Sequence, residues 1–183
     1  KDWYESMTEK QKAEFDLEKK KYKNKSNDKK TYEKYREVLG KNAPKTFADF
    51  QEMKYNEVEK YELFKTDFSR RNRLINNPDL ILPNVDTAEI DNKKFTGYLF
   101  DGKFKEGLVK GRLISDKLGY NINNYNDFKK EILSLSKEYP AKYKGSNPYG
   151  KKYEQEIFIY DKNNFPINLI VGWQVGKEST HMT

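Results

Sequence analysis

The only histidine of this chain, His181, is the side chain best suited to proton transfer near neutral pH. An unperturbed histidine has a pKa of about 6.5, so it can both take and give a proton there. The chain has no cysteine, which excludes a thiol nucleophile, a thiolate metal site and a disulfide framework. With a single histidine, a zinc site would need carboxylates almost throughout, so we expect no metal and no cofactor. Acid–base chemistry near pH 7 would therefore depend on His181 or on a perturbed carboxylate.

Hydroxyl groups surround His181 in the run 179–183 (STHMT). In an extended strand Ser179, His181 and Thr183 share one face, while Thr180 points to the other face and would need a bulge to join them. A proton-transferring group beside hydroxyl donors suits the cleavage of a phosphodiester without a metal. We therefore take His181 with Thr183 or Ser179 as the coherent catalytic set, and keep Thr180 as a further candidate phosphate donor.

The second half of the chain must supply the elements that position this set. Helices are expected over residues 104–118 and 124–139, and a short helix or strand over 92–100. Strands are expected over 153–160 and 167–175, joined as a hairpin, with a third strand beginning at Ser179. Residues 144–150 are expected as a loop. Trp173 continues the apolar face of its strand, which favours a place in the core.

The first half is predicted to be helical. Residues 6–9 (SMTE) have the form of a capping box, with Ser6 as the N-cap of a helix to about residue 25. A second helix is expected from about residue 28 to Gly40, and a third over residues 46–73, where apolar residues recur every three to five positions. Residues 76–90 contain two prolines and no sustained periodicity, which favours a linker. The expected organisation is a helical segment over 1–75, a linker over 76–90 and an α+β domain over 91–183.

The composition limits the classes of molecule that this protein is expected to bind. Hydrophobic residues make up 35% and charged residues 36%, and the net charge is +7. Residues 91–183 hold 16 basic and 11 acidic side chains, so most of the positive excess lies there. This excess is typical of a nucleic-acid partner, and equally of an ordinary lysine-rich surface. No apolar run approaches a membrane span, so we expect no membrane partner. We also expect the sequence to be a fragment of a longer protein.

Two resemblances fall in different halves. Residues 32–55 (YEKYREVLGKNAPKTFADFQEMKY), preceded by residues 3–8 (WYESMT), resemble the C-terminal part of tailed-phage minor head (head morphogenesis) proteins. The second half resembles the phage-encoded nuclease domains grouped with barnase, EndoU, RelE and tRNA-cleaving colicins. Its matching landmarks are residues 94–100 (KFTGYLF), 110–120 (KGRLISDKLGY) and 147–150 (NPYG), and Trp173 before a threonine-bearing strand. The second resemblance implies a barnase/RelE-like fold, with two or more helices packed on an antiparallel sheet.

The nuclease resemblance also implies a basic residue on the first helix against the sheet. Lys110 is the preferred catalytic candidate there. Candidate nucleic-acid-binding residues are Arg112, Lys177, Tyr149, Lys151 and Lys152. Each has an ordinary structural interpretation as well, because lysine and arginine often form only the solvated face of a helix. The cluster Arg70, Arg71 and Arg73 could contact phosphate, but cations at a helix C-terminus also complement its dipole.

The resemblances together imply a phage minor head protein fragment with a metal-independent ribonuclease-like, toxin-type domain. It would reside in the virion, and in the host cytoplasm after ejection. Two alternatives remain open: a non-catalytic virion protein that binds packaged or ejected DNA, and a structural head-assembly factor. The expected partners are nucleic acid (RNA substrate or phage DNA) and phage portal, scaffold or capsid proteins.

Overall fold

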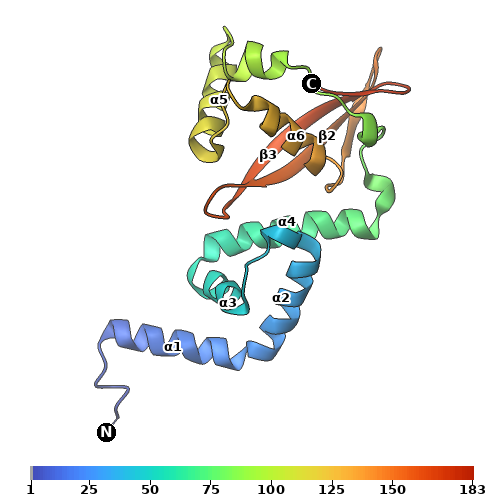
Figure 1. Ribbon diagram of the computed structural model, residues 1–183. Helices are drawn as coiled ribbons and strands as arrows, with labels where there is room; N and C mark the ends of the chain where they lie inside the picture. Colours follow the sequence, from blue (N-terminus) through green and yellow to red (C-terminus); the bar gives the residue numbers. More distant parts are fainter. Residues whose placement is uncertain (1) are drawn as a thin grey trace. The chain divides into compact units, whose positions relative to one another are not determined.

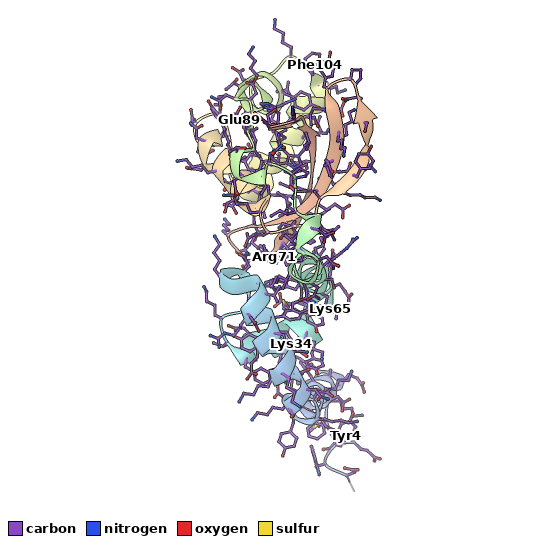
Figure 2. All side chains as sticks on the ribbon, turned by 90° about the vertical axis from the view of Figure 1, so that its right-hand side faces the viewer. Tyr4, Lys34, Lys65, Arg71, Glu89 and Phe104 are labelled. Atoms are coloured by element: carbon purple, nitrogen blue, oxygen red, sulfur yellow. The ribbon has the colours of Figure 1, made fainter. Side chains whose placement is uncertain are left out.

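The computed structural model describes residues 2–183 and shows an α+β protein, which confirms the predicted fold class. Helices come first along the chain, and a four-stranded antiparallel sheet comes last (Figure 1). The chain divides into two compact units, one up to Phe68 and one from Ser69 to Thr183; Figure 2 draws their side chains. The division falls inside helix α4, Val58–Asn76. Each unit has its own buried core.

Helix α1 of the first unit begins with a capping box built on Thr8, not on Ser6. Thr8 Oγ1 accepts from the Gln11 N–H at 3.2 Å, and Gln11 Oε1 accepts from the Thr8 N–H at 2.9 Å. Ser6 lies before the helix and donates to the Trp3 carbonyl instead. Residues 6–9 (SMTE) and 8–11 (TEKQ) both have the form of a capping box, so the spacing alone does not predict which of them caps the helix. The helices of this unit are α1 (Glu9–Lys23), α2 (Lys25–Leu39), η1 (Gly40–Asn42), α3 (Phe47–Asn56) and the first part of α4.

The single helix expected over residues 46–73 is wrong, because the structure has two helices there. Helix α3 ends at Asn56 and α4 begins at Val58, with Glu57 between them at φ −117° and ψ 61°, outside the helical region. Met53 is buried, whereas Val58 is 59% exposed. The five-residue step from Met53 to Val58 therefore marked a helix break rather than a continued apolar face.

Aromatic side chains form the core of the first unit. Phe50 and Phe64 are fully buried, and the Tyr35 ring contacts the rings of Phe50 and Phe68. It stacks on Phe68 with ring centroids 4.7 Å apart and meets Phe50 edge-on at 5.6 Å. Large rings bury much apolar area per residue, so few apolar positions suffice for this core.

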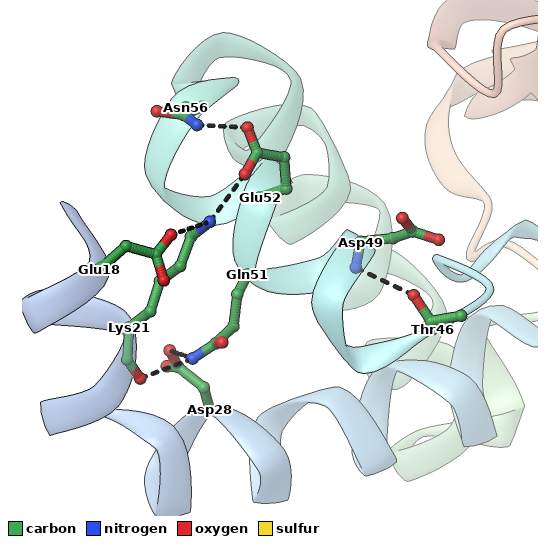
Figure 3. A network of polar contacts seen from close by, with 8 residues as sticks. All are labelled: Glu18, Lys21, Asp28, Thr46, Asp49, Gln51, Glu52 and Asn56. Carbon is green, nitrogen blue, oxygen red and sulfur yellow. Dashed lines mark hydrogen bonds and ion pairs between the residues drawn. The ribbon is translucent and has the colours of Figure 1, made fainter. Parts of the chain in front are cut away.

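A buried carboxylate, Asp28, joins α2 to α3. Lys54 Nζ donates to Asp28 Oδ1 at 2.6 Å, and Tyr55 Oη and Gln51 Nε2 donate to Oδ2 at 2.7 and 3.2 Å. Gln51 Nε2 also donates to the Lys21 carbonyl at 2.9 Å, which ties in the end of α1 (Figure 3). Burial by itself raises the pKa of the Asp28 carboxyl, but the three donors outweigh burial, and the pKa lies below its usual range.

The sheet of the second unit is a simple meander in the order β1-β2-β3-β4. Strands β2 and β3 confirm the predicted hairpin, and β4 confirms the predicted third strand. The elements after α4 are η2 (Pro78–Leu80), η3 (Val85–Thr87), η4 (Phe95–Leu99), α5 (Lys105–Leu118), α6 (Tyr125–Leu135), β1 (Lys142–Asn147), β2 (Gly150–Tyr160), β3 (Pro166–Val175) and β4 (Thr180–Met182).

One face of this sheet is covered by α6 and the residues that follow it, and we call it the covered face. Trp173 of β3 is fully buried there, as the sequence predicted, and its Nε1 donates to Gln155 Oε1 at 2.9 Å. Gln155 Nε2 in turn donates to the carbonyls of Ser136 and Tyr139 at 2.9 and 3.0 Å. This buried chain of hydrogen bonds fixes the end of α6 against the sheet.

Helix α5 packs against η4 through two glycines. A Cβ at Gly107 would lie 2.4 Å from the Tyr98 carbonyl oxygen, and one at Gly111 would lie 1.8 Å from that of Leu99. Only glycine permits so close an approach of two backbones. Phe95 of η4 meets Phe128 of α6 with ring centroids 5.8 Å apart. Helix α5 is thus linked through η4 to the helices of the covered face.

Residues 76–90, expected as a linker, pack within the second unit. Leu82 is fully buried and Ile90 is 2% exposed. The Leu80 carbonyl accepts from the Ala141 N–H at 2.8 Å, and the Glu89 N–H donates to the Thr180 carbonyl at 2.9 Å. The short 3-10 turns of this segment have neither the helical nor the strand period, so a search for periodicity does not find them.

Strand β1 covers residues 142–147, whereas the sequence predicts a loop from residue 144 onward. It reads Lys-Tyr-Lys-Gly-Ser-Asn, without alternating apolar residues, and it has an irregularity between Tyr143 and Gly145. Lysine, glycine and polar residues are typical of an edge strand that does not pair further. Only its pairing to β2 identifies it as a strand.

Candidate functional site

His181 lies on the face of the sheet opposite α6. In β4 it pairs with Gln174 of β3, and Gln174 pairs with Lys152 of β2. Directly opposed residues of antiparallel strands project to the same face, so these three side chains form one row. His181 and Lys152 are exposed, and Gln174 is half-buried. We call this side of the sheet the open face; at its other end it is covered by Arg70 of α4, which lies 4.5 Å from the centroid of the buried Phe158 ring.

Glu89 extends this row beyond β4. It forms an isolated parallel bridge with His181, in which the Met182 N–H donates to the Glu89 carbonyl at 3.0 Å. Glu89 Oε2 lies 3.7 Å from His181 Nδ1, and the two side chains are 74% and 53% exposed (Figure 2 labels Glu89). The row Glu89–His181–Gln174–Lys152 therefore places a carboxylate, an imidazole, an amide and an ammonium side by side.

Gln174 is held rigidly in the middle of the row. Its Oε1 accepts from Asn147 Nδ2 at 2.8 Å, and its Nε2 donates to Asn147 Oδ1 at 3.2 Å and to the Lys151 carbonyl at 3.4 Å. Both amide groups are thus engaged within the sheet. Gln174 acts as a fixed spacer between His181 and Lys152, and it ties β3 to the last residue of β1.

Thr183 lies on the open face next to His181, as the strand alternation predicted. Its N–H donates to the Gly172 carbonyl at 2.9 Å. A Cβ at Gly172 would lie 2.5 Å from Thr183 Oγ1, so the missing side chain of Gly172 makes room for the Thr183 hydroxyl. Ser179, the other hydroxyl candidate, lies in the β3–β4 turn, where its carbonyl accepts from the Gly176 N–H at 2.8 Å.

Thr180 is a structural residue, and its candidacy as a phosphate donor is wrong. Its side chain is fully buried, and its Oγ1 donates to the Pro83 carbonyl at 2.6 Å. No bulge rotates it to the open face, because β4 keeps regular pairing to β3 from Thr180 to Met182. The hydroxyl fastens residues 76–90 to the sheet instead.

Lys110 and Arg112 are not placed with His181. Both lie on α5, which packs on η4 in the layer of helices on the covered face, whereas His181 is on the open face. Lys110 Nζ pairs with Glu106 at 3.2 Å and lies 5.9 Å from the Tyr98 ring. The hydrogen bond to Glu106 raises the pKa of Lys110, so it stays a cation. The prediction that Lys110 lies on the first helix against the sheet fails, because that helix is α6, which carries lysines of its own, Lys129 and Lys130.

The other predicted nucleic-acid contacts gather at one end of the sheet. Tyr149 is 81% exposed in the β1–β2 turn, and Lys177 is exposed in the β3–β4 turn. The turns lie side by side, since a Cβ at Gly150 would meet the Val175 carbonyl oxygen at 2.1 Å. Lys152 belongs to the row. Its neighbour Lys151 projects to the other face, 6.0 Å from the Tyr143 ring.

Arg70 and Arg71 are occupied in structural contacts. Arg70 lies 4.5 Å above the Phe158 ring, pairs with Glu156 at 2.9 Å and donates to Asn168 Oδ1. Arg71 pairs with Glu138 at 3.2 Å. The phosphate-binding interpretation of this cluster therefore loses two of its members.

Sequence reasoning missed Glu89, Gln174 and Asn147. Glu89 is separated from His181 by 92 positions and has no local motif around it. Gln174 carries a usable signal, because it alternates with the buried Trp173 and Val175 and so had to face the other side. Its partner Asn147 depends on β1, which was not expected as a strand.

Within residues 2–183, no helix is long and apolar enough to cross a membrane. In the same part of the chain, no group of three or more His, Cys, Asp or Glu side chains is placed to hold a metal ion.

A family model described as a domain of unknown function, DUF6883, matches residues 81–182. The match covers the sheet, α5, α6 and Glu89, and it leaves out the first unit. No curated protein and no solved structure matches this chain.

Proposed function

We propose, for a chain that belongs to the DUF6883 family, that the second unit binds RNA on the open face of its sheet and cleaves it without a metal ion. The observation that carries this proposal is the row Glu89–His181–Gln174–Lys152. It brings a potential base, a potential acid and a cation together on one accessible surface. These are the groups that transfer of a phosphodiester to its own 2′-hydroxyl requires.

Two side chains each transfer one proton in this reaction. The Glu89 carboxylate accepts the proton of the ribose 2′-OH, and the 2′-oxygen attacks the adjacent phosphorus. As the bond from phosphorus to the 5′-oxygen breaks, protonated His181 gives its proton to that oxygen. The products are a 2′,3′-cyclic phosphate and a free 5′-hydroxyl. Lysine is too weak an acid for the second role near neutral pH, which leaves it to His181.

Lys152 and Thr183 are placed to bind the phosphate while charge develops on it. The Lys152 ammonium makes no ion pair with any other residue of 2–183, and the Thr183 hydroxyl makes no hydrogen bond within the same range. Both can therefore turn to a ligand without breaking an existing contact. A cation aimed at the non-bridging oxygens stabilises the transition state more than the ground state.

The test is cleavage of labelled RNA by the full chain, with and without EDTA. We expect EDTA-resistant cleavage that is lost in Glu89→Gln and in His181→Ala. Lys152→Ala should be impaired, whereas Lys110→Ala, which removes an exposed lysine from the covered-face layer, should cleave normally.

Three results would contradict the proposal. Unchanged cleavage in His181→Ala would remove the assigned site, and equal losses in Lys110→Ala and Lys152→Ala would show that position on the open face does not matter. Salt-sensitive retention of duplex DNA, with no cleavage of RNA at any protein concentration, would favour the non-catalytic DNA-binding role instead.

A further inference from the structure

The two turns at one end of the sheet form a second exposed surface beside the proposed catalytic row. We call it the turn surface and define it by Tyr149, Lys152 and Lys177. Tyr149 is 81% exposed, and its ring makes no contact with another ring among residues 2–183. Lys177, like Lys152, makes no ion pair within that range. An exposed ring in one turn, with one unpaired lysine in the adjacent turn and another in β2, suits a ligand that has both flat faces and negative charge.

The backbone that carries Tyr149 is fixed in place. Asn147 Oδ1 accepts from the Tyr149 N–H at 2.9 Å, and the same side chain forms the paired amide contact with Gln174. Gly150, with φ of +132°, brings the turn against the Val175 carbonyl, where no side chain would fit. The exposed ring therefore projects from a rigid support that is hydrogen-bonded directly to the catalytic row.

The distance from the turn surface to the row is short. Tyr149 lies three residues before Lys152, and Lys177 lies three residues after Gln174. At about 3.4 Å per residue, the tips of the turns lie roughly 10 Å from the row. A nucleotide whose phosphate contacts Lys152 can therefore place a neighbouring base at Tyr149.

We infer that the turn surface binds a base of single-stranded RNA by stacking on Tyr149, and that the protein therefore selects unpaired RNA. This rests on the proposed function, because the stacked base belongs to the strand that His181 would cleave. In a duplex the base faces are covered by their neighbours, so a stacking residue gains nothing from double-stranded RNA. Stacking is tolerant of base identity, since every base has a flat face.

The experiment measures binding separately from cleavage. A fluorescent RNA of about eight nucleotides with 2′-O-methyl groups cannot be cleaved, because it lacks the attacking hydroxyl. Its affinity is measured by anisotropy at one fixed salt concentration, as a single strand and annealed to its complement. The variants are Tyr149→Ala, Tyr149→Phe and, as a matched control, Tyr22→Ala, which removes an equally exposed tyrosine (83%) from the first unit.

We expect Tyr149→Ala to bind the single strand about 5- to 150-fold more weakly, the range for loss of one base–aromatic stack. Tyr149→Phe and Tyr22→Ala should bind it as the wild type does, and duplex affinity should not change. Equal single-strand affinity in Tyr149→Ala overturns the inference, as does an equal loss for single strand and duplex. If the wild type binds single strands through Tyr149 but cleaves no RNA, the proposed function fails alone.

Discussion

Replacing Gly111 by alanine should destabilise the second unit, although alanine is normally the better helix residue. The new Cβ would lie 1.8 Å from the Leu99 carbonyl oxygen and 2.6 Å from its carbon, and these are backbone atoms that cannot rotate away. Helix α5 would have to move off η4. Overpacking typically costs about 1–3 kcal/mol, and so short a contact with backbone belongs at the upper end. The gain in helix propensity, about 1 kcal/mol, offsets only part of this cost. We expect a net loss of about 2 kcal/mol in the free energy of unfolding.

A matched control is Gly97→Ala in η4. There the nearest atom to the new Cβ is Lys93 Cβ at 3.8 Å, an ordinary contact, so this variant should be neutral or slightly more stable. Urea unfolding followed by tryptophan fluorescence measures both variants. Trp173 is fully buried in the second unit, and Trp3 is 60% exposed in the first, so a Trp3→Phe background isolates the signal of Trp173. A Gly111→Ala protein as stable as the wild type would refute the reasoning about the close approach of α5 and η4.

Further outcomes are expected for variants of Asp28, Arg70, Thr180 and Thr183. Asp28→Ala should lower the stability of the first unit by about 3–5 kcal/mol, since it leaves partly buried donors without their acceptor. The pKa of Asp28 is lower in the folded than in the unfolded protein. The stability that its carboxylate contributes to the first unit is therefore complete above about pH 4 and is lost as the pH falls through the folded pKa. The unfolding midpoint of Asp28→Asn should accordingly change less on acidification than that of the wild type. Arg70→Ala should lower the stability of the second unit by about 1–3 kcal/mol, because it uncovers the Phe158 ring, and urea unfolding followed through Trp173 checks this. Thr180→Val should lower the free energy of unfolding of the second unit by about 1 kcal/mol yet leave RNA cleavage unchanged, whereas Thr183→Val should leave that free energy unchanged and slow cleavage.

Alternation of side chains predicted the part of the sheet that carries the site. The apolar face of β3 fixed Trp173 as a core residue, and the same alternation put His181 and Thr183 on the opposite face from Thr180. These inferences succeeded because the two-residue period of a strand is a local property. Strand β1 escaped the same reasoning, because its sequence has no apolar alternation.

The remaining parts of the site depend on contacts between distant positions. Glu89 lies beside His181 because of the bridge between residues 89 and 181, and no local sequence pattern predicts that bridge. Lys110 was misplaced because the sequence shows two amphipathic helices but not which of them lies on the sheet. Gly107 and Gly111 were the available signal, since small residues four positions apart permit a close backbone approach on one side of α5. That side packs on η4 and not on the sheet.

The bridge between Glu89 and His181 should also affect the order of folding and the local opening of the sheet. It closes a loop of more than ninety residues and is held by a strand of three, so it should form late in folding and open readily once formed. Such opening would separate the carboxylate from the imidazole while β2 and β3 stay paired. Exchange of the Glu89 and Met182 amide protons with deuterium would then report how often the row is assembled, independently of the rest of the sheet.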